Sequence, residues 1–87
     1  MGHKSPIMFF VYILYSKSLD RYYVGHTVSL NDRLKRHNSG RSKATKGGIP
    51  WVISYTETFE TKVDAYKRER SIKAKKSRIF IEKLIAR

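Results

Sequence analysis

The chain has 87 residues, and its 19 lysines and arginines against seven acidic residues give a formal net charge of +12. This length fits one compact domain and excludes a second. The absence of cysteine excludes a disulfide framework and a thiolate zinc site. No apolar stretch approaches the roughly 20 residues needed to span a bilayer, and no signal peptide is recognisable, so we expect a cytoplasmic protein without a membrane segment.

The strong positive charge indicates a polyanionic ligand. Nucleic acid is the first candidate, and an anionic membrane surface is the second. A basic surface without a ligand is the alternative, because charge alone does not specify what a protein binds. The sequence lacks the long amphipathic basic helix that would favour a membrane surface.

Residues 1–6 are mostly polar and end in a proline, so we expect a disordered leader or a remnant of cloning, followed by a single domain over residues 7–87. Residues 7–16 are rich in aromatic and β-branched side chains and predict a strand. Residues 17–20 supply turn chemistry, and residues 21–26 predict a second strand. Together these segments predict a β-hairpin.

The register of this hairpin decides where two tyrosines lie. With a two- or four-residue loop centred on Ser18 and Leu19, Tyr12 lies opposite Gly25. Tyr23 is then its diagonal neighbour on the same face, about 7 Å away. Gly25 has no side chain, so the space over Tyr12 stays open. A three-residue loop would put Tyr23 on the other face, and the sequence leaves this choice open.

Ser29 is a credible N-cap for a first helix, which should run to about Asn38 and end before Gly40. Residues 41–50 predict a flexible, ligand-facing loop. Residues 51–59 alternate and predict a third strand. One phase of that strand holds Trp51, Ile53, Tyr55 and Phe59.

Two further helices complete the order. Thr61, with Asp64 three residues later, can cap a helix that reaches about Lys76. Ser77 can cap a short third helix through Ile85, whose apolar residues can dock on the core. The order β-β-α-β-α-α predicts an α+β fold, in which a small three-stranded antiparallel sheet is flanked by helices.

Three polar residues lie on inward helix faces. Arg33 and His37 are one turn apart among leucines. Arg33 could hold a phosphate and His37 could move a proton. Alternatively, both side chains could reach solvent from an exposed flank of the helix. Glu69 lies beside an apolar stripe. It could bind Mg²⁺ together with a substrate phosphate, or simply pair with Lys73 at i, i+4. His26, like His3, is isolated and is assigned no role.

The stretches Phe10-Val11-Tyr12 and Tyr23-Val24-Gly25 resemble the two halves of the GIY-YIG nuclease motif. Arg33 falls where that family has its helix arginine, and His37 where many members have a histidine or tyrosine. Glu69 falls where the family has its metal-binding glutamate. The resemblance covers about residues 8–80, and the segments around residues 50–51 and 69–73 look like short stand-alone bacterial members.

The sequence departs from the family pattern at a few positions. Phe10 replaces the first glycine of the motif, and valines replace both isoleucines. Some family members carry a further asparagine near the C-terminus. No asparagine matches it here, and Lys73 is a candidate substitute.

The resemblance implies a metal-dependent nuclease that hydrolyses phosphodiester bonds of nucleic acid. The expected substrate is DNA rather than RNA. The enzyme is expected to recognise the structure of the substrate rather than its sequence, as enzymes of DNA repair do. It implies that Glu69 holds Mg²⁺ or Mn²⁺ and that Tyr12 activates water, directly or with His37. Because a tyrosine of pKa about 10 is a poor base, cations such as Arg33 must lower that pKa. Tyr23 would orient the water or phosphate, and Arg33 would stabilise phosphoryl charge.

The remaining basic residues are expected to grip the nucleic-acid backbone, which gives affinity with little sequence choice. A protein partner could supply targeting. The main rival is a non-catalytic nucleic-acid-binding module on the same fold, and the second is an interaction or membrane-surface protein. The expected backbone contacts are Arg41, Lys43, Lys46, Lys73, Lys75, Lys76 and Arg78.

Overall fold

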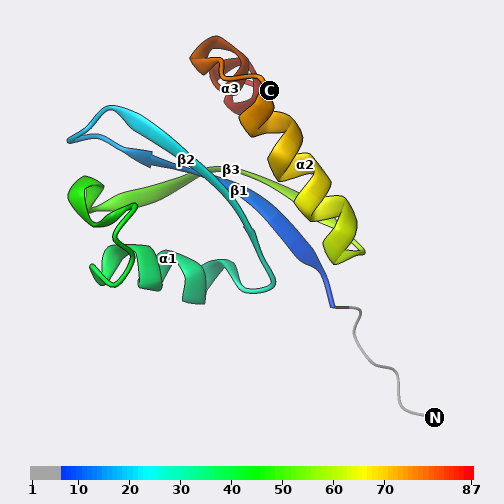
Figure 1. The fold of residues 1–87 in the computed structure, drawn as a ribbon, viewed down its shortest axis with the longest axis horizontal. Helices are drawn as coiled ribbons and strands as arrows, with labels where there is room; N and C mark the ends of the chain where they lie inside the picture. Colours follow the sequence, from blue (N-terminus) through cyan, green and yellow to red (C-terminus); the bar gives the residue numbers. More distant parts are fainter. Residues whose placement is uncertain (1–6) are drawn as a thin grey trace.

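The computed structural model describes residues 7–87, so the predicted leader over residues 1–6 lies outside the described part. The order of elements is β-β-α-β-α-α with a short 3-10 turn before the third strand, which confirms the predicted α+β fold (Figure 1). No helix in residues 7–87 is long and apolar enough to cross a membrane. The elements are β1 (Phe9–Ser16), β2 (Arg21–Thr27), α1 (Leu30–Asn38), η1 (Lys46–Gly48), β3 (Trp51–Phe59), α2 (Lys62–Ala74) and α3 (Arg78–Ile85).

The three strands form one antiparallel sheet in the order β2-β1-β3. The turn between β1 and β2 has four residues, 17–20, and it sets Tyr12 opposite Gly25 and Leu14 opposite Tyr23. Since side chains alternate along a strand, Tyr12 and Tyr23 share one face of the sheet. The structure therefore adopts the register that brings the two tyrosines together.

The central strand β1 is buried on both faces. Val11 and Ile13 pack in a core with the helices α2 and α3, through residues such as Ile72. Tyr12 and Leu14 face the opposite way and pack near α1. Figure 1 shows the same arrangement, with α1 on one side of the sheet and α2 and α3 on the other. The sheet thus separates two small cores, and β2 forms its edge between the two helical layers.

A β-bulge interrupts β3. Ile13 pairs with Tyr55 whereas the next residue, Leu14, pairs with Ile53, so Ser54 has no partner of its own. The extra residue reverses the alternation of side chains along the strand. The prediction that Trp51, Ile53, Tyr55 and Phe59 lie on one phase was therefore wrong. Trp51 and Ile53 share one face of the sheet, and Tyr55 and Phe59 share the other.

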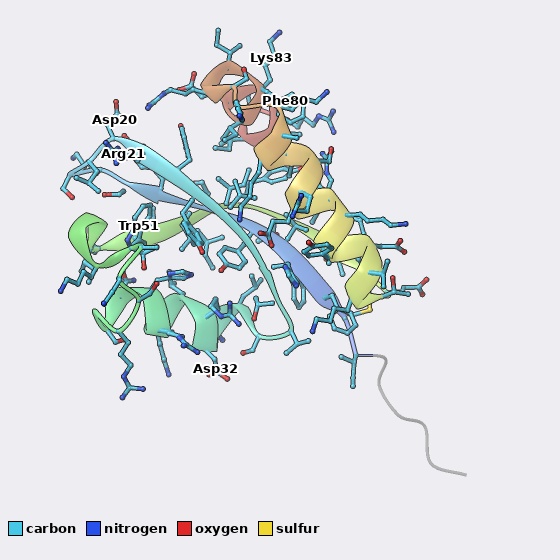
Figure 2. All side chains as sticks on the ribbon, viewed as in Figure 1. Asp20, Arg21, Asp32, Trp51, Phe80 and Lys83 are labelled. Carbon is cyan, nitrogen blue, oxygen red and sulfur yellow. The ribbon has the colours of Figure 1, made fainter. Side chains whose placement is uncertain are left out.

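The consequence of this bulge is that Trp51 packs with Tyr12 on the α1 face. Tyr55 packs in the opposite core, together with Val11 and Ile13. Figure 2 shows Trp51 near the start of β3, close to α1. The bulge thus supplies the α1 side of the sheet with a large aromatic side chain.

The predicted helix caps are present. The side chain of Ser29 accepts a hydrogen bond from the Asp32 amide, and Thr61 accepts one from that of Asp64. Ser77 caps α3 in the same way. α2 ends at Ala74, slightly earlier than the expected limit near Lys76, because Lys76 has a left-handed backbone with φ of +47°.

Candidate active site

The side chains of Tyr12 and His37 form a buried hydrogen bond between β1 and α1. The Tyr12 hydroxyl lies 3.0 Å from Nε2 of His37, and the two residues are 2% and 3% exposed. His37 is therefore not a flank residue that reaches for solvent. Arg33, one turn earlier on α1, is half-buried.

Gly25 allows the Tyr12 ring to reach this position. A Cβ on Gly25 would lie 2.6 Å from Cζ of Tyr12, well inside van der Waals contact. The space over Gly25 is thus filled by the ring of Tyr12 itself. The hydroxyl is carried across β2 toward the outer edge of the sheet.

Tyr23 completes an aromatic cluster around the imidazole. Its ring centroid lies 4.9 Å from that of His37 and 6.3 Å from that of Trp51, both in edge-on geometry. From the other side of β2, Nζ of Lys73 lies 5.8 Å from the Tyr23 ring centroid. Tyr23 therefore contacts groups from both helical layers.

Glu69 on α2 makes two short polar contacts. Its Oε1 accepts from Nδ1 of His26 on β2 at 2.5 Å, and its Oε2 accepts from Nζ of Lys73 at 2.6 Å. Its side chain is 12% exposed. Burial alone would raise the pKa of Glu69, but the hydrogen bonds from His26 and Lys73 outweigh it and lower that pKa.

His26 is the site residue that the sequence reasoning missed. It pairs with Val11 in the sheet and so faces α2, whereas its neighbour Gly25 pairs with Tyr12. A signal was present: once the register is fixed, the alternation of β2 puts His26 on the face that α2 covers. The contact with Glu69, 43 positions away, is visible only in the folded chain.

Two groups of residues therefore lie on opposite faces of the sheet and meet at the outer edge of β2. Tyr12, Tyr23 and His37 belong to the α1 face, and His26 and Glu69 belong to the α2 face. Arg33 links them, because it lines a pocket of about 310 Å³ together with His26. The structure thus brings all five predicted site residues to one region.

Burial controls the proton chemistry of the buried pair. It raises the pKa of Tyr12 to about 12, although the nearby Arg33 guanidinium acts in the opposite direction. In the protein without a bound metal or substrate, the expectation that Arg33 lowers the pKa of Tyr12 below its ordinary value is wrong. Desolvation of the phenolate raises this pKa by more than the charge of Arg33 lowers it. Burial, with Arg33 and Arg36, lowers the pKa of His37. The imidazole is thus neutral near pH 7 and able to accept a proton.

Glu69 offers one carboxylate to a cation. Residues 7–87 contain no group of three or more histidine and acidic side chains that could enclose a metal ion. The donor set still fits a hard cation that keeps most of its waters, since such an ion needs only one or two protein carboxylates plus substrate oxygens. Lys73 would have to release Oε2, which its long side chain permits.

The predicted backbone-binding residues divide into two groups. Lys73, Lys76 and Arg78 line a pocket of about 410 Å³ beside Tyr23. Arg78 is also held by Asp20 and Glu82, so part of its role is structural. Lys75 lies over the ring of Phe80. On the α1 side of the sheet, the segment between α1 and β3 carries three exposed basic residues, Arg41, Lys43 and Lys46.

Comparison with known proteins identifies the family of this chain. A GIY-YIG catalytic domain is recognised over residues 8–83. A UPF0213 protein of Clostridium perfringens is 43% identical over 67 residues, which make up 76% of this chain and 71% of that protein. One of Staphylococcus aureus is 39% identical over an alignment of 79 residues, and the match covers 85% of this chain and 95% of the relative. The solution NMR structure of a UPF0213 protein from Bacillus halodurans is 34% identical, with a TM-score of 0.57 over 91% of this chain and 83% of that chain.

The fold and the site thus define a GIY-YIG catalytic domain, a class of endonuclease domain that acts on nucleic acid and generally depends on a divalent metal. The chain belongs to the GIY-YIG family, and within it to the UPF0213 proteins, a small stand-alone group. The family resemblance read from the sequence is confirmed.

Proposed function

We propose that this protein is a divalent-metal-dependent nuclease that hydrolyses phosphodiester bonds of DNA, directed by the structure of the substrate. The observation that carries the proposal is the buried hydrogen bond between Tyr12 and a neutral His37. An uncharged imidazole in contact with the Tyr12 hydroxyl can accept the proton of that phenol while the phenol accepts a proton from water. The same edge of β2 carries the carboxylate of Glu69.

Tyr12 and His37 act together as the base. Because the pKa of Tyr12 is about 12, a free phenolate is too rare to serve as the base at neutral pH. The attacking water passes its proton to the Tyr12 oxygen while Tyr12 passes its own proton to Nε2 of His37. The water oxygen forms the new bond to phosphorus. The bond from phosphorus to the leaving sugar oxygen breaks, and this oxygen departs with the electron pair and takes a proton from solvent. His37 is left as an imidazolium.

The remaining site residues bind and orient the phosphate. Arg33 presents a planar fork of donors to the phosphoryl oxygens, on which negative charge grows in the transition state. The Tyr23 hydroxyl orients the water or the phosphate. Glu69 holds Mg²⁺ or Mn²⁺, and this ion supplies charge neutralisation and Lewis-acid assistance when bound. His26 fixes the orientation of the Glu69 carboxylate.

The basic residues on both sides of the site bind the nucleic-acid backbone. Such contacts give affinity and salt dependence but do not read bases. Selection of a site therefore depends on the shape of the nucleic acid, as DNA repair requires, or on a protein partner. The residues assigned to these contacts are Arg41, Lys43, Lys46, Lys73, Lys75, Lys76 and Arg78.

A second candidate is a non-catalytic nucleic-acid-binding module. One observation favours it: both oxygens of Glu69 are already engaged, by His26 and by Lys73. A carboxylate held in this way can join β2 to α2 without binding a metal. This candidate keeps the basic surface and predicts binding without cleavage.

The decisive experiment measures cleavage of labelled single-stranded, duplex and branched DNA, with matching RNA, in Mg²⁺, in Mn²⁺ and in EDTA. Cleavage of DNA by the wild type should be lost in EDTA and in Glu69→Gln. Glu60→Gln, which changes an exposed glutamate after β3, is the matched control and should cleave normally. Binding without cleavage by the wild type would favour the second candidate, and equal cleavage by Glu69→Gln would overturn the assignment of Glu69.

A further inference from the structure

Thr45 is buried in a segment that the sequence predicts to be flexible and ligand-facing. It lies between α1 and β3, and it is 0% exposed, whereas its neighbours in the chain are exposed. Its Oγ1 lies 2.9 Å from Nδ1 of His37. The imidazole is thus held between two hydroxyl groups, those of Tyr12 and Thr45. Neither the family resemblance nor the sequence pattern singles out this threonine.

The backbone of Thr45 is fixed on several sides. Its amide donates to the Ser42 carbonyl at 3.2 Å, and its carbonyl accepts from the Gly48 amide at 3.0 Å. The same carbonyl accepts from Nε1 of Trp51 at 2.6 Å. Trp51 is itself held by two hydrogen bonds between its backbone and the Asn38 side chain. The position of the Thr45 hydroxyl is therefore set by the fold around it.

The neutral imidazole carries one proton, and two arrangements can satisfy its contacts. In the first, Tyr12 donates to Nε2 and Nδ1 donates to Thr45. In the second, Thr45 donates to Nδ1 and Nε2 donates to Tyr12. The positive charge of Arg33 acts on the Tyr12 oxygen. It favours the first arrangement, because the phenol then turns a lone pair toward the cation and its proton toward His37.

We propose that Thr45 is a positioning residue for the proposed hydrolysis: its hydroxyl accepts the Nδ1 proton of His37 and so fixes the tautomer whose Nε2 takes the proton of Tyr12. This inference rests on the proposed function. The same hydrogen bond supports the imidazolium after proton transfer, since both ring N–H groups then have an acceptor. Outer partners of metal-bound histidines contribute roughly 10- to 100-fold, which sets the expected scale.

The test compares Thr45→Val, which keeps the shape of the side chain and removes the hydroxyl, with Thr45→Ser, which keeps the hydroxyl. Nitrogen-15 NMR of the His37 ring should show the Nδ1–H tautomer in the wild type and in Thr45→Ser. In Thr45→Val the tautomer should shift toward Nε2–H. The cleavage kcat should fall roughly 10- to 100-fold in Thr45→Val with little change in KM, and Thr45→Ser should restore most of it.

The Nε2–H tautomer in the wild type would overturn the proposal, even if Thr45→Val fails to fold. A Thr45→Val protein with the tautomer and the kcat of the wild type would overturn it equally. A wild-type protein that shows the Nδ1–H tautomer but cleaves no substrate would distinguish the proposed hydrolysis from the hydrogen bond that Thr45 makes to His37. In that case the proposed hydrolysis fails, and with it the catalytic role of Thr45, while the hydrogen bond itself stands.

Discussion

The ring of Tyr12 lies directly across the backbone of Gly25, its partner in the neighbouring strand. The two residues are opposite each other in the register of β1 and β2. A Cβ at Gly25 would come within 2.6 Å of Cζ of Tyr12. A glycine at this one position therefore allows a tyrosine from the central strand to place its hydroxyl at the edge of the sheet.

Replacing Gly25 by alanine should displace the Tyr12 ring and weaken its contact with His37. Overpacking of this kind typically destabilises a protein by about 1–3 kcal/mol, and cleavage should fall more than stability because the base moves. Gly47→Ala is the matched control, since a Cβ there would meet nothing within 4 Å. Urea unfolding and cleavage rates measure both effects. Unchanged cleavage by a folded Gly25→Ala protein would contradict the placement of Tyr12 in the reaction.

Arg33→Lys should keep the positive charge on α1 but lose the planar fork of donors. If Arg33 stabilises charge that develops on the phosphoryl oxygens, kcat should fall about 100-fold, the scale of losing one such donor. The control is Arg36→Lys, which makes the same change at an exposed position on the same helix. Single-turnover cleavage compares the two, and equal rates for both variants would remove Arg33 from the mechanism.

The ion pair between Glu57 and Arg68 should make stability depend on acid pH. Arg68 donates two hydrogen bonds to Glu57, at 2.8 and 3.0 Å, and joins α2 to β3. These bonds, opposed by burial, lower the pKa of Glu57 below its ordinary value of 4.5. A lowered pKa means that the carboxylate stabilises the fold above about pH 4.5, and that this contribution is lost as the pH falls through the lower value in the folded state.

Glu57→Gln should therefore lower the free energy of unfolding by about 1–2 kcal/mol at pH 7. The difference from the wild type should shrink as the pH is taken below about 4.5. Urea unfolding over a pH series measures it, with the exposed Glu60→Gln as the control. A difference that stays constant across the series would show that Glu57 contributes by packing and not by its charge.

Lys43→Gln and Lys46→Gln should weaken binding of nucleic acid without changing its sequence preference. When the logarithm of the binding constant is plotted against the logarithm of the salt concentration, the slope is negative. Each loss of a phosphate contact should reduce the magnitude of this slope by about 1. Lys83 on α3 is the control, because it lies well apart from the loop after α1 (Figure 2). Fluorescence titrations over a range of salt give the slopes. The same slope in Lys43→Gln as in Lys83→Gln would remove Lys43 from the binding surface.

The sequence by itself determined the elements and their order. Alternation of apolar side chains, the caps at Ser29, Thr61 and Ser77, and the glycine after α1 are local signals, and each acts within a few residues. They sufficed to predict the α+β fold. For the site, two observations from the sequence identified the candidate residues. These were the resemblance of the two tyrosine stretches to a family motif and the inward positions of Arg33 and Glu69. The structure brings these residues to one edge of the sheet.

Only the tertiary structure decided how these residues interact. The bulge at Ser54 moved Trp51 to the α1 face, and His26 became a partner of Glu69 across 43 positions. Desolvation of the Tyr12 phenolate, and not the charge of Arg33, set the direction of its pKa shift. The physical reason is the same in each case: pairing, burial and charge depend on side chains that are distant in the chain, and no local pattern encodes which of them will meet.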